Sequence, residues 1–70
     1  MKSYFVRVKR QEINQFDNFC SRHNLEQQYL SEGIWQGHIG TSLYRIPMNH
    51  TDAMALKLTL DIDIMETQNG

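Results

Sequence analysis

Two stretches near opposite ends of the chain alternate between two sets of side chains with a period of two residues. Residues 4–9 (YFVRVK) place a tyrosine and two valines on one side, and residues 58–64 (LTLDIDI) place aliphatic residues on one side and polar residues on the other. This period is typical of strands that bury one face, because successive side chains of a strand point to opposite sides. We therefore expect the chain to begin and end with strands of one half-buried sheet.

The segment after the first strand has a helical period. In residues 10–24 (RQEINQFDNFCSRHN), the face with this period carries Ile13, Phe16, Phe19, Cys20 and His23. Asn24 is expected to end the helix in the left-handed conformation, with Leu25 directly after it. The pattern predicts one amphipathic helix.

Residues 26–48 have no helical period, and glycines interrupt their β-forming residues. We interpret them as a hairpin with its turn at "GTS" (40–42) and a second arm that Pro47 closes. An alternative divides the segment into three short strands, with "SEG" (31–33) as an additional turn. "GHIG" (37–40) has the form of a phosphate-clamping loop that joins two helices in one class of RNA-binding domain. Because its neighbours here are expected to be strands, we assign its glycines to turn or bulge positions.

The rest of the chain completes the fold prediction. Asn49 or Thr51 can cap a short helix, "DAMALKL" (52–58). The order β-α-β-β-α-β predicts a single small α+β domain over residues 1–66 with the ferredoxin-like arrangement, an antiparallel sheet with both helices on one face. Residues 67–70 are expected to form a flexible tail.

Charge and cysteine content argue against several classes of protein. The net charge of −1 provides no whole-molecule field that would attract nucleic acid or an anionic membrane. The lone Cys20 cannot form an intrachain disulfide. No stretch is as apolar and long as a signal peptide or a membrane span. We therefore expect a cytoplasmic protein whose stability is modest, because a chain of 70 residues buries only a small core.

Asp61 and Asp63 are the nearest approach to a catalytic pair. In the expected sheet the first and last strands are antiparallel neighbours, so these carboxylates should lie on the same face as Arg7 and Lys9. A general acid needs burial or a like charge that raises its pKa, and neighbouring cations act in the opposite direction. The sequence therefore predicts no catalytic residue, and we do not expect an enzyme.

Four residues are of types that bind zinc: Cys20, His23, His38 and His50. Only Cys20 and His23 share a helix face, and the two other histidines lack the paired spacing of a zinc site. We assign Cys20 to the apolar face of the helix and His23 to its last turn. No metal ion and no cofactor is predicted.

The open side of the expected sheet suggests one possible activity. Phe5, Arg7 and Lys9 on a central strand, with Leu43 and Arg45 on the next, make an aromatic and basic face such as RNA-recognition domains use to stack bases. The aromatic-rich second motif of those domains is absent, and the aspartates on the same face weaken phosphate attraction. RNA or DNA binding through this face is therefore the alternative function.

Trp35 is the residue that most favours an interface, although a core position is the other interpretation. Tryptophan, tyrosine and arginine are the residue types that most often anchor interfaces, and Trp35, Tyr29 and Arg45 lie on segments expected to be exposed. An edge strand also offers unpaired backbone groups to a second chain. We expect either self-association or a protein partner at these residues.

Residues 44–60 (YRIPMNHTDAMALKLTL) resemble an ending common in small uncharacterised tailed-phage proteins, a strand followed by a helix of the form D-A-x-x-x-K-L. The matching positions Ala53, Leu56 and Leu58 are packing residues, so the resemblance transfers no site. It implies a phage origin, in which small proteins often bind a host or viral protein. We expect a small non-enzymatic protein-binding module, a phage accessory factor or an inhibitor of a host protein.

Overall fold

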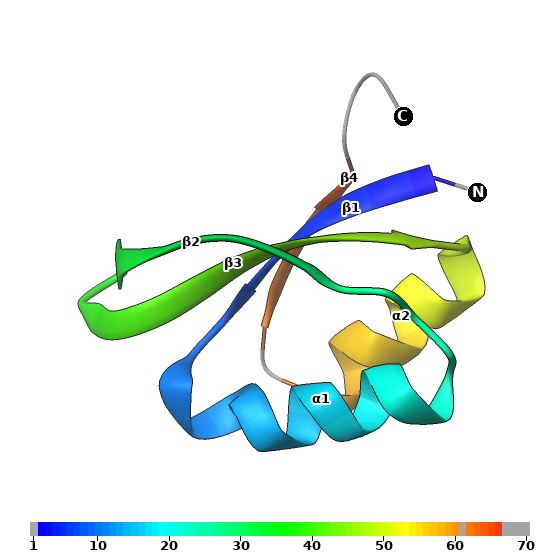
Figure 1. Cartoon of the computed structure of the whole chain (residues 1–70), viewed down its shortest axis with the longest axis horizontal. Coiled ribbons are helices and arrows are strands. Elements are labelled where there is room, and N and C mark those ends of the chain that lie inside the picture. The colour runs from blue at the N-terminus through cyan, green and yellow to red at the C-terminus, as the bar shows by residue number, and fades with distance from the viewer. Residues whose placement is uncertain (1, 61, 67–70) are drawn as a thin grey trace.

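The computed structural model describes residues 2–60 and 62–66. The strands and helices are β1 (Lys2–Val8), α1 (Ile13–Arg22), β2 (Gln28–Trp35), β3 (His38–Met48), α2 (His50–Thr59) and β4 (Asp63–Glu66). A short 3-10 helix, η1 (Arg10–Glu12), leads into α1. The predicted order β-α-β-β-α-β is confirmed (Figure 1). The predicted tail at 67–70 lies outside the described residues.

The four strands form one antiparallel sheet in the order β2-β3-β1-β4. Strands from opposite ends of the chain, β1 and β4, are therefore neighbours, as the sequence predicts. Both helices lie on the same side of the sheet, below it in Figure 1. We call this the helix side and the opposite side the open face.

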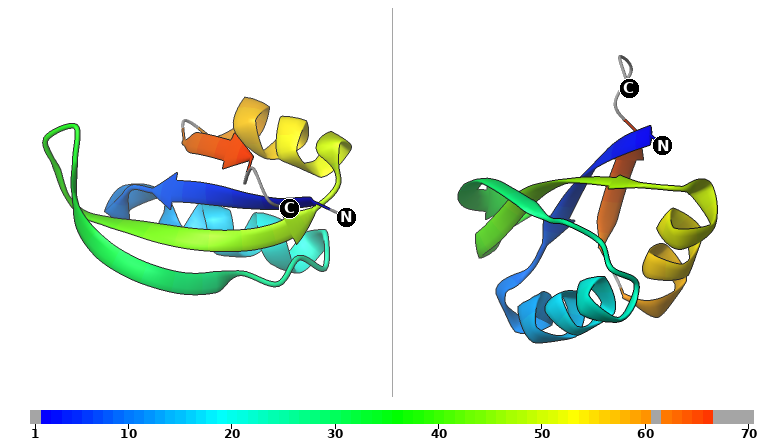
Figure 2. Two further views of the ribbon diagram at one scale, coloured as in Figure 1. Left: turned by 90° about the horizontal axis from the view of Figure 1, so that it is seen from above. Right: turned by 45° about the vertical axis from the view of Figure 1, so that its right-hand side comes forward.

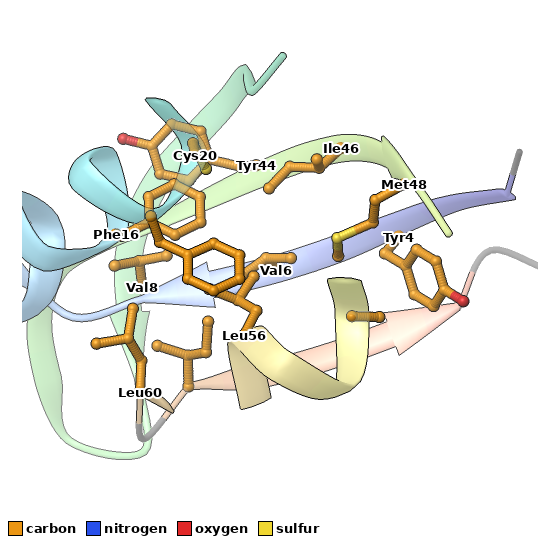
Figure 3. Close-up of a cluster of buried hydrophobic side chains, with 13 residues drawn as sticks. Tyr4, Val6, Val8, Phe16, Cys20, Tyr44, Ile46, Met48, Leu56 and Leu60 are labelled. Atoms are coloured by element: carbon orange, nitrogen blue, oxygen red, sulfur yellow. The ribbon is translucent and has the colours of Figure 1, made fainter. Parts of the chain in front are cut away.

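The core lies between the helices and the strand residues that point toward them (Figure 3). Phe16 of α1 is fully buried, and its ring centre lies 4.9 Å from that of Tyr44 in β3. The buried cluster consists of Tyr4, Val6, Val8, Phe16, Phe19, Cys20, Tyr44, Ile46, Met48, Ala53, Leu56, Leu60 and Ile62. This cluster confirms the predicted face of the first strand and, at Phe16, Phe19 and Cys20, that of the first helix, whereas His23 is exposed.

The end of α1 follows the sequence prediction. Asn24 has a φ of +54°, in the left-handed region. The backbone N–H of Leu25 donates to the carbonyl of Cys20 at 2.9 Å, and the Leu25 side chain packs against the core. This combination of a returning hydrogen bond and an apolar contact ends the helix and directs the chain toward β2.

α2 extends further than the alternating pattern at 58–64 suggests. Of the two predicted caps, Asn49 is the one used: its side chain accepts a hydrogen bond from the backbone N–H of Asp52 at 2.8 Å. The helix continues through Thr59, so the prediction of a strand beginning at Leu58 is wrong. Leu58 is 82% exposed on the outer surface of α2, and the last strand begins only at Asp63.

The turn of the long hairpin also differs from the prediction. β2 and β3 are joined by Gln36 and Gly37, which have φ values of +50° and +81°. Positive φ at both central residues is characteristic of the type I′ hairpin turn, whose backbone twist matches that of the flanking strands. "GTS" (40–42) and "SEG" (31–33) are parts of strands, so both the predicted turn and the three-strand alternative are wrong.

Gly40 marks a bulge rather than a turn. It is the extra residue of β3 between two ladder pairs, Gly33 with Thr41 and Ile34 with Ile39, and its φ is +79°. Glycine adopts this conformation without the steric cost that other residues incur. The assignment of the glycines at 37 and 40 to turn and bulge positions is confirmed.

Candidate interaction surface on the open face and the hairpin

The open face brings side chains of three strands into register. Phe5 of β1 is paired with Arg45 of β3, and Arg7 is paired with Leu43 on one side and with Asp63 of β4 on the other. The expected placement of Asp63 beside Arg7 is therefore confirmed. Asp61, the other member of the supposed catalytic pair, lies outside the described residues.

Arg7 holds the centre of this face. Its Nη1 donates to the Asp63 carboxylate at 3.1 Å, and its guanidinium carbon lies 5.3 Å from the centre of the Trp35 ring. The Arg7 and Asp63 side chains are about one-third exposed, 31% and 36%. The charge of Arg7 is thus already shared between a carboxylate and an aromatic ring.

Trp35 belongs to the open face and not to the core. It is half-buried and does not belong to the buried cluster. The β2–β3 hairpin reaches beyond the helices and bends at its tip, as the left view of Figure 2 shows. Trp35 contacts Arg7 of β1, a contact between residues 28 positions apart that the linear sequence does not reveal.

The outer strand β2 presents the most exposed surface. Every residue from Gln28 to Ile34 is exposed. At the tip, Ile34 and Ile39 face each other across the ladder and are 71% and 73% exposed. A pair of large aliphatic side chains this exposed leaves apolar surface in contact with water.

The five residues predicted to bind a partner do not form one cluster. Phe5, Arg7, Arg45 and Trp35 lie on the open face. Tyr29 lies near the other end of β2 on the helix side, where its ring meets that of Tyr44 edge-on at 5.8 Å. Tyr29 remains 54% exposed, so this contact covers only part of it.

Sequence reasoning missed the two isoleucines of the hairpin tip. Ile34 and Ile39 lie symmetrically about Gln36 and Gly37. A two-residue turn at Gln36 and Gly37 would have placed these isoleucines opposite each other in the predicted hairpin. The signal was weak because glutamine, unlike asparagine or glycine, rarely begins such a turn.

Two open hollows lie along β2. One, of about 510 Å³, is lined by Ser3, Gln28, Arg45 and Pro47, among others. The other, of about 210 Å³, is lined by residues of three strands that include Arg7, Ser31, Trp35, Thr41 and Leu43. The first hollow is also lined by Glu26 and the second by Glu32, and neither is lined by a histidine or a cysteine.

Cys20 and His23 point to different surroundings. Cys20 is buried in the core, and burial, with a smaller contribution from Asp17, raises the pKa of its thiol to about 11. His23 stacks on Phe19, with ring centres 4.1 Å apart, and its Nδ1 lies 3.3 Å from the Asp52 carboxylate. Within residues 2–60 and 62–66, no three histidine, cysteine, aspartate or glutamate side chains gather as metal ligands.

Comparisons with protein families, with curated proteins and with solved structures find no match for this chain. In the described part of the chain, no helix is both long and apolar enough to cross a membrane.

Proposed function

We propose that this chain is a small non-enzymatic protein-binding module whose contact surface is the outer edge of β2 together with the tip of the β2–β3 hairpin. The observation that carries the proposal is the exposed isoleucine pair, Ile34 and Ile39, at 71% and 73% exposure, at the end of a strand whose residues 28–34 are all exposed. Apolar side chains at the end of a projecting hairpin lose contact with water when a partner covers them. The binding free energy gained in this way grows with the apolar area that is buried.

The edge of β2 supports the same surface. β2 lies at one end of the described sheet and pairs with β3 only, so its other edge carries backbone groups that a partner strand can bond. β4, at the opposite end, has only four residues against eight in β2 and so offers a shorter ladder.

Nucleic-acid binding on the open face is the second candidate. It is favoured by Phe5, which lies half-buried opposite the exposed Arg45. It is weakened by Arg7, whose charge is engaged by Asp63 and Trp35. Phosphate binding would have to compete with that ion pair, so we rank protein binding first.

The strand order and antiparallel pairing support the ferredoxin-like description of the fold. The resemblance of residues 44–60 to tailed-phage proteins agrees with a phage accessory factor or an inhibitor of a host protein, acting in the cytoplasm. Homo-oligomerisation is the other form that binding at this edge can take.

The test compares two surface variants of matched chemistry. Ile34→Ser with Ile39→Ser alters the hairpin tip, and Met54→Ser with Leu58→Ser alters the outer face of α2, where the side chains are 46% and 82% exposed. Each tagged protein is incubated with host lysate with and without nuclease treatment, and any captured protein is purified and titrated against the three forms.

We expect the tip variant to bind the purified partner at least about tenfold more weakly than wild type, as truncation of interface anchors commonly does. The α2 variant should bind like wild type. Capture that disappears with nuclease and depends on Phe5 and Arg45 would replace this proposal with the nucleic-acid alternative. Binding lost only in the α2 variant would contradict it as well.

A further inference from the structure

The side chains of β2 on the helix side form a simple pattern. Tyr29, Glu32 and Ile34 are paired with Tyr44, Ser42 and Ile39 of β3. A register shift between Tyr29 and Ser31 adds one residue to β2, so these three are successive positions of one face despite their uneven numbering. A strand added to this edge would meet an aromatic, an acidic and an aliphatic side chain in turn.

Glu32 is the only charged residue of β2. It is exposed, and it has no ion-pair partner within residues 2–60 and 62–66. Opposite charges on facing positions of neighbouring strands stabilise the pairing, and like charges weaken it. On a strand added to this edge, the Glu32 carboxylate therefore favours a cationic side chain at the facing position and disfavours an acidic one.

We propose that β2 accepts an extended segment of another protein in which a lysine or arginine is flanked at alternate positions by apolar residues. The apolar residues would cover Tyr29 and Ile34, and the cation would lie opposite Glu32. Because this pattern reads the same in both directions, it applies to parallel and antiparallel addition alike. The inference rests on the proposed function and specifies the partner's chemistry.

A second copy of this chain fits the edge less well. Two antiparallel β2 strands centred on Glu32 would place two carboxylates opposite each other, which is unfavourable. Shifting the register by two residues places Glu32 opposite an isoleucine instead. The pairing preference thus favours a different chain.

The test uses two synthetic peptides, acetyl-TVTKTVT-amide and acetyl-TVTETVT-amide, titrated into ¹⁵N-labelled full-length protein. Amide chemical shifts are followed for the wild type, for Glu32→Lys, and for Glu26→Lys as a control that changes the net charge equally. Glu26 is exposed and precedes β2.

For the wild type we expect shift changes along β2 and a preference of about threefold to fivefold for the lysine peptide. Glu32→Lys should reverse the preference, and Glu26→Lys should keep it. The inference is overturned if both peptides bind with equal affinity, or if no shift changes up to the solubility limit. It is also overturned if the shift changes are confined to β4 or the open face, or if the free protein associates with itself through β2. When one of these results is found, the capture test decides how far it reaches. If the hairpin-tip variant still loses a captured partner, only this inference is wrong. If that variant binds the partner like wild type, the proposed function is wrong too.

Discussion

The guanidinium carbon of Arg7 lies 5.3 Å from the centre of the Trp35 ring, so a residue of the central strand β1 holds the tip of the hairpin on the open face. This contact joins segments that share no ladder. It explains why Trp35 is half-buried although the rest of β2 is exposed.

Replacing Trp35 should therefore loosen the hairpin without unfolding the protein. We expect Trp35→Ala to lower the free energy of unfolding by about 1–2 kcal/mol, from a lost cation–π contact and some lost apolar burial. Trp35→Phe should lose less, because a ring remains. Urea denaturation measures both, and a loss as large as that of a core phenylalanine would show that the ring is a core residue.

The ion pair between Arg7 and Asp63 should contribute little to stability. Its N–O distance is 3.1 Å, but both side chains are about one-third exposed, so water screens the attraction. We expect Asp63→Asn to cost under about 1 kcal/mol, and less at high salt. A double-mutant cycle with Arg7→Gln measures the coupling, and a coupling of several kcal/mol would mean that the pair is effectively buried.

Phe16 should be among the most costly residues to truncate. It is fully buried and packs on Tyr44. Phe16→Ala should lower the unfolding free energy by about 3–5 kcal/mol, through lost burial and the cavity that remains. Leu58→Ala serves as the control, since Leu58 is 82% exposed and should change stability by less than about 0.5 kcal/mol. Similar costs for the two variants would contradict the assigned core.

The hairpin glycines offer a graded test of backbone strain. Gly37 and Gly40 have φ values of +81° and +79°, in the region that side chains rarely adopt. Gly33 does not have a positive φ, and an added Cβ there would meet nothing within 4 Å. At Gly40 that Cβ would lie 2.7 Å from the end of the Arg10 side chain, which can move aside. We expect Gly37→Ala and Gly40→Ala each to cost about 1–2 kcal/mol, and Gly33→Ala much less. Thermal or urea unfolding ranks the three, and a far greater cost at Gly40 would show that Arg10 is rigidly held.

The buried thiol should make the protein sensitive to alkali. Burial raises the pKa of Cys20 from 9.0 to about 11, so the folded chain keeps a proton that the unfolded chain releases. This contribution to stability is fully present below pH 9 and is lost as pH rises toward 11. Urea denaturation at pH about 8 and about 10 gives the free energy of unfolding at each pH. Between these two pH values this free energy should fall more for the wild type than for Cys20→Ala, by up to about 1.4 kcal/mol per pH unit.

Tyr44 is a second buried acid. Burial also raises the pKa of Tyr44, and this residue is present in both proteins. Comparing the slopes of the wild type and Cys20→Ala therefore isolates the thiol. Equal slopes would indicate that the thiol is accessible to water.

Several elements could be predicted because their determinants are local. The apolar spacing of Phe16, Phe19 and Cys20 identifies the buried face of α1, since a helix repeats every 3.6 residues. Asn24 and Asn49 mark helix ends by chemistry that acts within four residues, a left-handed stop and a side-chain cap.

The last strand illustrates where local pattern is ambiguous. Leu58 fits the alternation of residues 58–64 and equally fits the final turn of a helix. The backbone N–H of Leu60 donates to the Leu56 carbonyl at 3.0 Å, and Leu56 and Leu60 are both buried. Packing of these two leucines against the sheet, rather than propensity, places the helix end.

The sequence by itself determined the order of the elements and the buried faces of β1 and α1, because hydrophobic period and capping act over short distances. The pairing of β1 with β4 followed from that order through the expected topology. Only the tertiary structure decided the hairpin turn at Gln36 and Gly37, the exposure of Ile34 and Ile39, and the contact of Trp35 with Arg7. Those features depend on strand register and on the bend of a projecting hairpin, and both are set by cross-strand contacts between residues distant in the chain.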